Sequence, residues 1–116
     1  MYINATGYYI PSERVDNDHF LHLNGLTADW ILKRTGISTR SKAAEGEGHN
    51  SMGLAAIENA LPELPYDIKD VDLIVSASYS PYDTVATLAH IAQQHYDIDG
   101  AKAVYASAAC SSFVNG

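Results

Sequence analysis

The stretch VDLIVSAS, Val71–Ser78, decides the fold. It is a short apolar run rich in β-branched residues, of the kind that forms a parallel strand covered on both faces. The segment Thr84–Tyr96, TVATLAHIAQQHY, then repeats apolar residues at helical spacing, and Ala101–Ala109, AKAVYASAA, predicts another buried strand. A strand, a helix and a second strand in this order indicate an α/β layered fold with parallel strands in its middle.

Upstream of this unit, the opening segment Met1–Pro11, MYINATGYYIP, mixes β-forming residues with a glycine and closes on proline. This composition predicts a first strand followed by a turn. Val15–Gly25, VDNDHFLHLNG, predicts a short helix with Asp16 or Asn17 as its N-cap. In all, the pattern predicts about three core strands with connecting helices.

Three further segments lie between these elements. Leu26–Gly36, LTADWILKRTG, predicts a helix that Thr27 caps and that ends at Gly36 in a left-handed conformation. The polar, glycine-containing segment Ile37–Asn50 predicts a surface strand or loop. Ser51–Leu64, SMGLAAIENALPEL, predicts a buried helix of small residues that its proline ends.

Composition narrows the class of protein. With 116 residues and 47% hydrophobic content, the chain is long enough for one ordinary domain. A formal net charge of −7 argues against a nucleic-acid partner, because such proteins need a basic face to displace counterions. No stretch approaches the about 18 to 20 apolar residues that span a bilayer, and no secretory signal is visible. We therefore expect no membrane association and a cytoplasmic location, with which a single cysteine agrees.

That cysteine, Cys110, stands in YASAACSSFVNG, Tyr105–Gly116. If the strand ends before it and a helix begins after it, the sulfur lies at the carboxyl end of a strand and at a helix N-terminus, where a thiolate is favoured. Small residues on both sides allow a sharp turn and close approach of a substrate. The alternative is a small hydrophobe that fills the core, since cysteine is among the most buried residue types.

The chain resembles the β-ketoacyl-acyl carrier protein synthase III family of the thiolase-like superfamily. Four segments carry this resemblance, in the family's order and at about its spacing: GYYIPSERVDN at 7–17, DWILKRTGISTR at 29–40, DVDLIVSASYSP at 70–81 and YASAACSSF at 105–113. The string W-I-x-x-R-T-G-I, Trp30–Ile37, is the most specific of them. We thus expect residues 1–116 to be the N-terminal portion of a thiolase-like condensing-enzyme domain, cut near the start of the nucleophile helix.

The resemblance implies a decarboxylating condensation that starts fatty acid synthesis. Cys110 would take an acyl group from an acyl-coenzyme A, and the thioester would then accept a carbanion from malonyl-acyl carrier protein. A soft thiolate both attacks and leaves readily in such an exchange, and the Cys110 backbone N–H would help form the oxyanion hole. The family's catalytic His and Asn lie in the C-terminal half, and none of the five histidines here matches that position. We do not expect this chain alone to complete the reaction.

The resemblance also assigns a coenzyme A site and no covalently bound cofactor. Trp30 and Arg34 stand four residues apart, on one face of their helix. An indole can stack on adenine and a guanidinium can bind phosphate, as the family's matching residues do. Thr27 is a weaker candidate for this site. Without the resemblance, Trp30 would be interpreted as a packing anchor and Arg34 as a solvated charge.

The family forms homodimers, in which the loop after the strand at 71–78 contributes to the partner's acyl pocket. Val85 and Ala86 stand where familiar members often have a bulky residue followed by proline. A less bulky wall favours a longer or branched primer, unless backbone shifts cancel the change. Acyl carrier protein is acidic, so we expect its basic docking surface outside this acidic segment.

Three alternatives concern the kind of site, the activity and whether the chain is catalytic. His19 and His22, three residues apart, can form a metal-binding pair, but no third ligand is clustered with them, so we expect no metal site. A related thiolase-superfamily enzyme, such as a 3-hydroxy-3-methylglutaryl-coenzyme A synthase or a secondary-metabolite synthase, is the alternative activity. A non-catalytic chain with an inert, buried thiol is the alternative outside catalysis.

Overall fold

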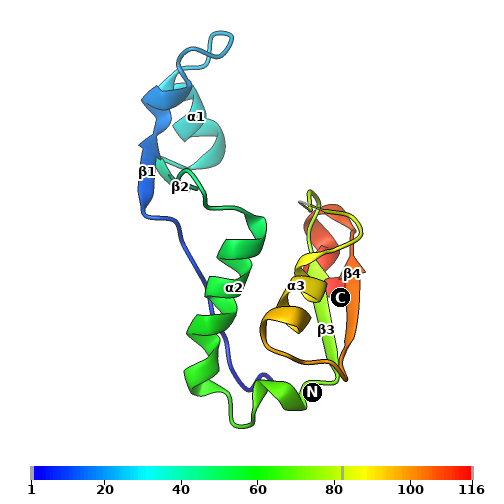
Figure 1. Ribbon diagram of the computed structural model, residues 1–116. Coiled ribbons are helices and arrows are strands. Elements are labelled where there is room, and N and C mark those ends of the chain that lie inside the picture. Colours follow the sequence, from blue (N-terminus) through cyan, green and yellow to red (C-terminus); the bar gives the residue numbers. More distant parts are fainter. Residues whose placement is uncertain (1, 82, 116) are drawn as a thin grey trace. The chain divides into compact units, whose positions relative to one another are not determined.

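The computed structural model describes residues 2–81 and 83–115, which divide into two compact units (Figure 1). One unit comprises Met1–Tyr9 together with Gly48–Gly116, and the other is the intervening segment Ile10–Glu47. The strands are β1 Glu13–Asp16, β2 Thr39–Lys42, β3 Leu73–Ala77 and β4 Lys102–Ala106. The α-helices are α1 Ala28–Thr35, α2 His49–Ala60, α3 Leu88–His95 and α4 Ser112–Asn115. Short 3₁₀-helices are η1 Asn17–Phe20, η2 Leu61–Glu63, η3 Ile68–Asp70 and η4 Ala109–Ser111.

The strand, helix and strand at 73–106 form the predicted parallel unit. β3 and β4 pair in parallel, with Leu73 opposite Lys102 and Ala77 opposite Ala106, and α3 packs against both strands. The core beneath α3 is made of small and aliphatic residues: Ala89, Ala92, Ile98 and Ala101. A parallel pair requires a crossover, and the helix that supplies it covers the sheet. The βαβ prediction is therefore confirmed.

Only one face of this sheet is covered. Burial alternates along both strands, and Leu73, Val75 and Val104 lie 52%, 38% and 45% exposed on the other face. The prediction that these strands are covered on both faces is thus wrong for the described residues. The physical reason is that α3 packs on one side, whereas an apolar run alone does not say how many layers surround it.

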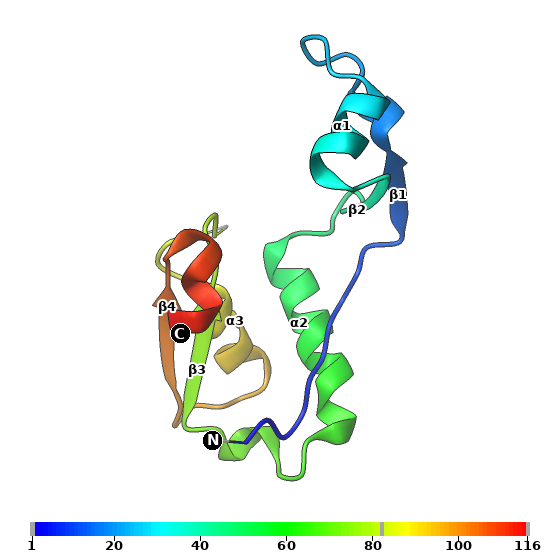
Figure 2. The ribbon, with the colours of Figure 1, turned by 180° about the vertical axis from the view of Figure 1, so that it is seen from behind.

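The first strand predicted from the sequence is also wrong. Residues 2–11 form no strand, and residues 2–9 instead run alongside α2, as both views show (Figures 1 and 2). Asn59 Nδ2 of α2 donates to the Tyr8 carbonyl at 2.9 Å, and Gly7 lies against the backbone of the same helix. A strand needs a partner for its backbone groups, and here an α-helix is the neighbour. The helix α2 is half-buried rather than buried, since none of its residues is fully covered.

The segment 10–47 forms a small unit of its own. β1 and β2 pair antiparallel, with Glu13 opposite Lys42 and Asp16 opposite Thr39. The short helix predicted near residue 17 is the 3₁₀-helix η1, and Asp16 is its N-cap, because its carboxylate accepts from the Asp18 N–H at 3.0 Å. Arg40 lies over the Phe20 ring, 4.7 Å from its centroid, and joins β2 to η1. These contacts connect the strand pair to the helical part of the unit.

Asn17 is the buried polar anchor of this unit, with only 6% of its surface exposed. Its amide donates to the Ile37 carbonyl at 2.9 Å and to the Ala28 carbonyl at 3.4 Å, and its Oδ1 accepts from Arg40 Nη2 at 2.8 Å. One side chain thus joins the first residue of α1, the segment that follows this helix, and β2. Buried polar groups that lose such a partner cost about 1 to 3 kcal/mol each.

We expect Asn17→Ala to lower the free energy of unfolding of this unit by about 2 kcal/mol, because it removes the three hydrogen bonds of a buried side chain. Trp30, the single tryptophan, lies in the same unit, so its fluorescence during urea unfolding measures the change. Asn4→Ala is the control, since Asn4 is exposed. Equal effects of the two substitutions would contradict the role of Asn17.

No helix among residues 2–81 and 83–115 is both long enough and apolar enough to cross a membrane.

Candidate active site

Cys110 lies on the turn that leads out of β4. The strand ends at Ala106, η4 covers Ala109–Ser111, and α4 follows directly from Ser112. The strand-to-helix transition predicted around the cysteine is therefore confirmed. Cys110 is exposed, so the interpretation as a buried thiol that fills the core does not describe this structure.

The backbone just before Cys110 adopts a conformation that is rare for a residue with a side chain. Ala109 has a φ of 47°, in the left-handed region, and Ala108 precedes it with φ −141° and ψ 41°. An L-residue in the left-handed region costs about 1 to 2 kcal/mol. Such conformations persist only where neighbouring groups hold them, and they cluster at functional sites. The small residues around the cysteine thus permit the sharp turn that the sequence predicts.

Two serine hydroxyls hold this turn. Ser112 is 4% exposed, and its Oγ accepts from the Ala108 N–H at 2.7 Å while donating to the Ala109 carbonyl at 2.8 Å. Ser111 Oγ donates to the Ala108 carbonyl at 2.8 Å. These bonds satisfy backbone groups that the helical turn leaves open. The cysteine is therefore presented on a preformed turn.

A second segment reaches the same edge of the sheet. The Tyr105 hydroxyl donates to the Ser78 carbonyl at 2.6 Å, and the Ser78 N–H donates to the Ala106 carbonyl at 3.3 Å. These bonds join the end of β3 to the end of β4, four residues before Cys110. In open α/β sheets, functional groups gather at the carboxyl ends of strands. The segment that follows β3 therefore starts beside the cysteine turn.

The loop between β3 and α3 carries Val85 and Ala86. The Val85 side chain is 82% exposed, and Ala86 is partly covered. Tyr82, within this loop, lies outside the described residues. The loop is fixed at its far end by Thr87, which is 3% exposed and whose Oγ1 accepts from Ser76 Oγ of β3 at 3.3 Å. Val85 is thus an apolar side chain displayed to the surroundings from a loop with fixed ends.

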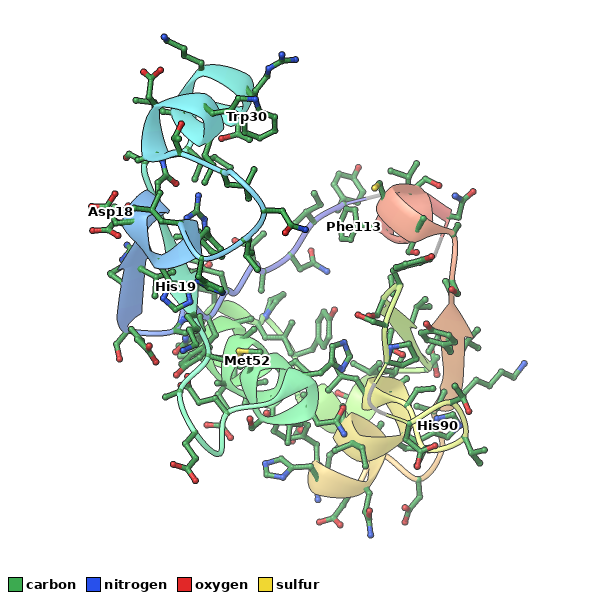
Figure 3. All side chains as sticks on the ribbon, turned by 90° about the horizontal axis from the view of Figure 1, so that it is seen from above. Asp18, His19, Trp30, Met52, His90 and Phe113 are labelled. Atoms are coloured by element: carbon green, nitrogen blue, oxygen red, sulfur yellow. The ribbon has the colours of Figure 1, made fainter. Side chains whose placement is uncertain are left out.

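Trp30 and Arg34 lie together on α1, as the spacing predicts. Figure 3 shows the Trp30 side chain on this helix. The Arg34 guanidinium is 5.6 Å from the centroid of the Trp30 ring, and Trp30 is 48% exposed. Thr27 Oγ1 accepts from the Trp30 N–H at 3.1 Å, which confirms its predicted capping role. Gly36 ends the helix with a φ of 71°. The arrangement offers a flat aromatic face beside a cation.

Two of the histidines lie on α3, and two others lie together in the unit 10–47. His90 lies on α3 (Figure 3), and its Nδ1 is 3.0 Å from Thr87 Oγ1. His95 Nε2 lies 3.7 Å from Glu58 Oε1, and burial and the neighbouring Glu58 carboxylate raise the pKa of the adjacent Tyr96. His19 and His22 face each other edge to face at 6.2 Å between ring centroids. Within the described ranges, no three His, Cys, Asp or Glu side chains are grouped as metal ligands.

Two residues that shape the site were not found by sequence reasoning. Ser112 was interpreted only as a small neighbour of Cys110, and Asp83 was not singled out. The signal for Asp83 was present, because an aspartate in a loop often accepts from the backbone N–H two residues on, as Asp83 does from Val85 at 2.7 Å. For Ser112 no local signal distinguishes it from Ser111, because its burial depends on the fold of the turn.

Comparison with known proteins supports one family. The sequence is 38% identical over 114 residues to the β-ketoacyl-[acyl-carrier-protein] synthase III of Deinococcus deserti. The aligned region covers 98% of this chain and 33% of that protein. The crystal structure of 3-oxoacyl-[acyl-carrier-protein] synthase III from Aquifex aeolicus VF5 superposes with a TM-score of 0.87 at 31% identity, over 97% of this chain and 36% of the other. No family model matches the chain.

A third relative has a different pathway in its name. The priming β-ketosynthase of the R1128 polyketide biosynthetic pathway superposes with a TM-score of 0.87 at 29% identity, over 97% of this chain and 34% of the other. The fold and the cysteine turn thus define a thiolase-like α/β protein. In sequence and in fold, the chain belongs to the β-ketoacyl-acyl carrier protein synthase III family. It spans about a third of the length of the relatives it matches.

Proposed function

We propose that the protein that carries this sequence is a β-ketoacyl-acyl carrier protein synthase III, which joins an acyl-coenzyme A primer to malonyl-acyl carrier protein to start fatty acid synthesis. The observation that carries the proposal is the exposed Cys110 on a strained, hydrogen-bonded turn between β4 and α4. Its position in a chain of this family supports the role of nucleophile.

The first step of the proposed reaction is acyl transfer. The Cys110 thiolate attacks the carbonyl carbon of the acyl-coenzyme A thioester, a carbon–sulfur bond forms, and coenzyme A leaves as a thiolate that takes up a proton. The small side chains around Cys110 leave room for that carbonyl. The Cys110 backbone N–H is our candidate for stabilising the oxyanion of the tetrahedral intermediate.

The second step is the decarboxylating condensation. Malonyl-acyl carrier protein loses carbon dioxide, its α-carbon attacks the acyl-Cys110 carbonyl, and the Cys110 thiolate leaves as the β-ketoacyl product forms. We expect the His and Asn that assist this step outside these 116 residues. The proposal therefore assigns the acyl-accepting half of the chemistry to this chain, with no covalently bound cofactor.

The proposal places coenzyme A recognition at α1. The exposed indole of Trp30 is free to stack on adenine, and Arg34 beside it supplies a cation for phosphate. Thr27 is a weaker member of the site, because its hydroxyl already caps α1. Lys33 on the same helix pairs instead with Asp29 at 2.8 Å.

We expect Trp30→Ala and Arg34→Ala each to raise the Kd for coenzyme A by about tenfold, a loss that corresponds to one stacking or phosphate contact. Isothermal titration with coenzyme A measures the effect. Lys33→Ala is the matched control on the same helix and should change the Kd less than about twofold. An equal loss with Lys33→Ala would show that only net charge matters and would contradict a specific site.

The proposal also includes a homodimer, in which Val85 and Ala86 of one subunit line the acyl pocket of the other. The exposure of Val85 supports this role, because an apolar side chain displayed from a fixed loop is suited to insert into a partner. A small residue at this wall leaves room for a longer or branched primer. Neither nucleic acid nor membrane is among the proposed partners.

A panel of acyl-coenzyme A primers tests the function. With the full-length protein that carries this sequence, we expect coenzyme A release, a mass increase equal to the acyl group on the peptide that contains Cys110, and carbon dioxide release once malonyl-acyl carrier protein is added. Acyl transfer to another residue would overturn the proposal. A panel of carrier proteins tests the second candidate, a priming synthase of polyketide formation, which the similarity to the R1128 enzyme favours. Selective use of a polyketide carrier protein would support that candidate.

A further inference from the structure

The loop between β3 and α3 has an internal brace in addition to its two fixed ends. The ends are held by the Tyr105 hydroxyl on the Ser78 carbonyl and by the contacts of the buried Thr87 hydroxyl. Between them, the loop is exposed and contains no helix or strand among its described residues. An apolar side chain on such a loop keeps a single orientation when the backbone next to it is restrained.

Asp83 provides this restraint. The Val85 N–H donates to Asp83 Oδ1 at 2.7 Å, and the Ala86 N–H donates to the same oxygen at 3.2 Å. One carboxylate oxygen thereby holds the backbone on both sides of the Val85 side chain. Hydrogen bonds to a charged acceptor are among the stronger ones. These two bonds keep the pKa of Asp83 below its ordinary value, and the bond from the Val85 N–H has the larger effect.

Thr87 continues the restraint beyond the brace. As the N-cap of α3, it makes no side-chain capping bond, and its hydroxyl instead contacts Ser76 of β3 and His90 one turn along the helix. The backbone after Ala86 is therefore attached to the sheet and to the helix at once. With Asp83 holding the preceding residues, Val85 lies between two restrained points.

We propose that Asp83 is a positioning residue that presents Val85 in one orientation and thereby sets the primer preference of the enzyme. The inference rests on the proposed function, in which Val85 lines the acyl pocket of the partner subunit. Asp83 itself touches no substrate in this proposal. It acts through the backbone of the two residues that follow it.

The brace is tested in the whole chain by NMR of the Val85 and Ala86 amides. Both signals should shift with pH at a midpoint below that of an ordinary aspartate, because the bonds weaken as the carboxylate is protonated. Asp83→Asn keeps an acceptor oxygen, so the two amides should retain their shifts at neutral pH and lose the titration. Asp83→Ala should move both amides toward unbonded values. Unchanged amide signals in Asp83→Ala would overturn the brace.

The specificity is tested by kcat/KM for short and for branched or longer acyl-coenzyme A primers. Asp83→Ala should change the ratio between them by about tenfold, the scale at which apolar pockets distinguish neighbouring chain lengths. Asp83→Asn should remain within about twofold of the original ratio. Asp99→Ala is the control, since Asp99 is an exposed aspartate of the same unit. An equal fall in kcat/KM for all primers would contradict a role in specificity.

The two proposals can fail separately. If the unsubstituted protein transfers no acyl group to Cys110, the proposed function is wrong, and the assignment of specificity to Asp83 falls with it. The amide measurements still decide whether Asp83 holds the loop. If acyl transfer occurs and the primer ratio is insensitive to Asp83→Ala, only the further inference is wrong.

Discussion

Replacing Cys110 with serine is expected to lower the rate of acyl transfer from acyl-coenzyme A at least about a thousandfold, as for other nucleophile substitutions. A hydroxyl is almost wholly protonated at neutral pH and is a much poorer nucleophile than a thiolate. The exposed position of Cys110 makes a folding defect an unconvincing explanation for the loss. Mass spectrometry of the protein after incubation with acyl-coenzyme A measures the acyl group directly.

The matched control for this prediction is Ser107→Ala. Ser107 is exposed and lies on the same turn, three residues before the cysteine, so its substitution should leave acyl transfer within about twofold of the original rate. Acylation that persists in Cys110→Ser would place the nucleophile elsewhere. Iodoacetamide should also label Cys110 in the folded chain, and labelling only after denaturation would contradict its exposure.

Replacing Gly7 with alanine is expected to destabilise its unit by about 2 to 3 kcal/mol. A Cβ at this position would overlap the Ala56 carbonyl oxygen and lie 2.8 Å from both the backbone N and the Cβ of Ala60. Since these are mainly backbone atoms of α2, the N-terminal segment must move away from the helix. Urea unfolding followed by far-UV circular dichroism measures the loss.

Two other glycines give a graded control. Gly100→Ala should change stability by less than about 0.5 kcal/mol, because nothing lies within 4 Å of a Cβ there. Gly53→Ala should fall between the two, since the added methyl meets the Leu88 side chain of α3, which is able to shift. A Gly100→Ala effect as large as that of Gly7→Ala would show that lost chain flexibility, and not close packing, is responsible.

Local signals allowed several elements to be predicted well. Thr27 and Gly36 bound α1 as expected, because a capping hydroxyl and a left-handed glycine act through neighbouring backbone groups. Asp16 caps η1 for the same reason. The spacing of Trp30 and Arg34 placed them on one helix face, and the contact between them follows from the helical repeat. Each of these features depends on residues within a few positions of one another.

Features that depend on distant partners were predicted less well. The β-forming residues at 2–11 suggested a strand, but strand formation requires a neighbour, and the neighbour here is α2. The apolar run of β3 identified a strand and a parallel partner, yet it did not reveal that one face stays exposed. The burial of a strand depends on the layers that pack around it, so a local sequence pattern does not reveal it.

For Cys110, the sequence by itself determined the segment, the order of strand and helix, and the family that the surrounding motifs resemble. The tertiary structure alone decided that the thiol is exposed, that Ala109 takes a left-handed conformation, and that the buried Ser112 hydroxyl holds the turn. It also placed the β3–α3 loop beside that turn, through the bond between Tyr105 and Ser78. The physical reason is the separation along the sequence of the groups that interact. Caps and helical faces depend on residues a few positions apart, whereas the exposure of a side chain and backbone strain depend on the distant segments that pack around it.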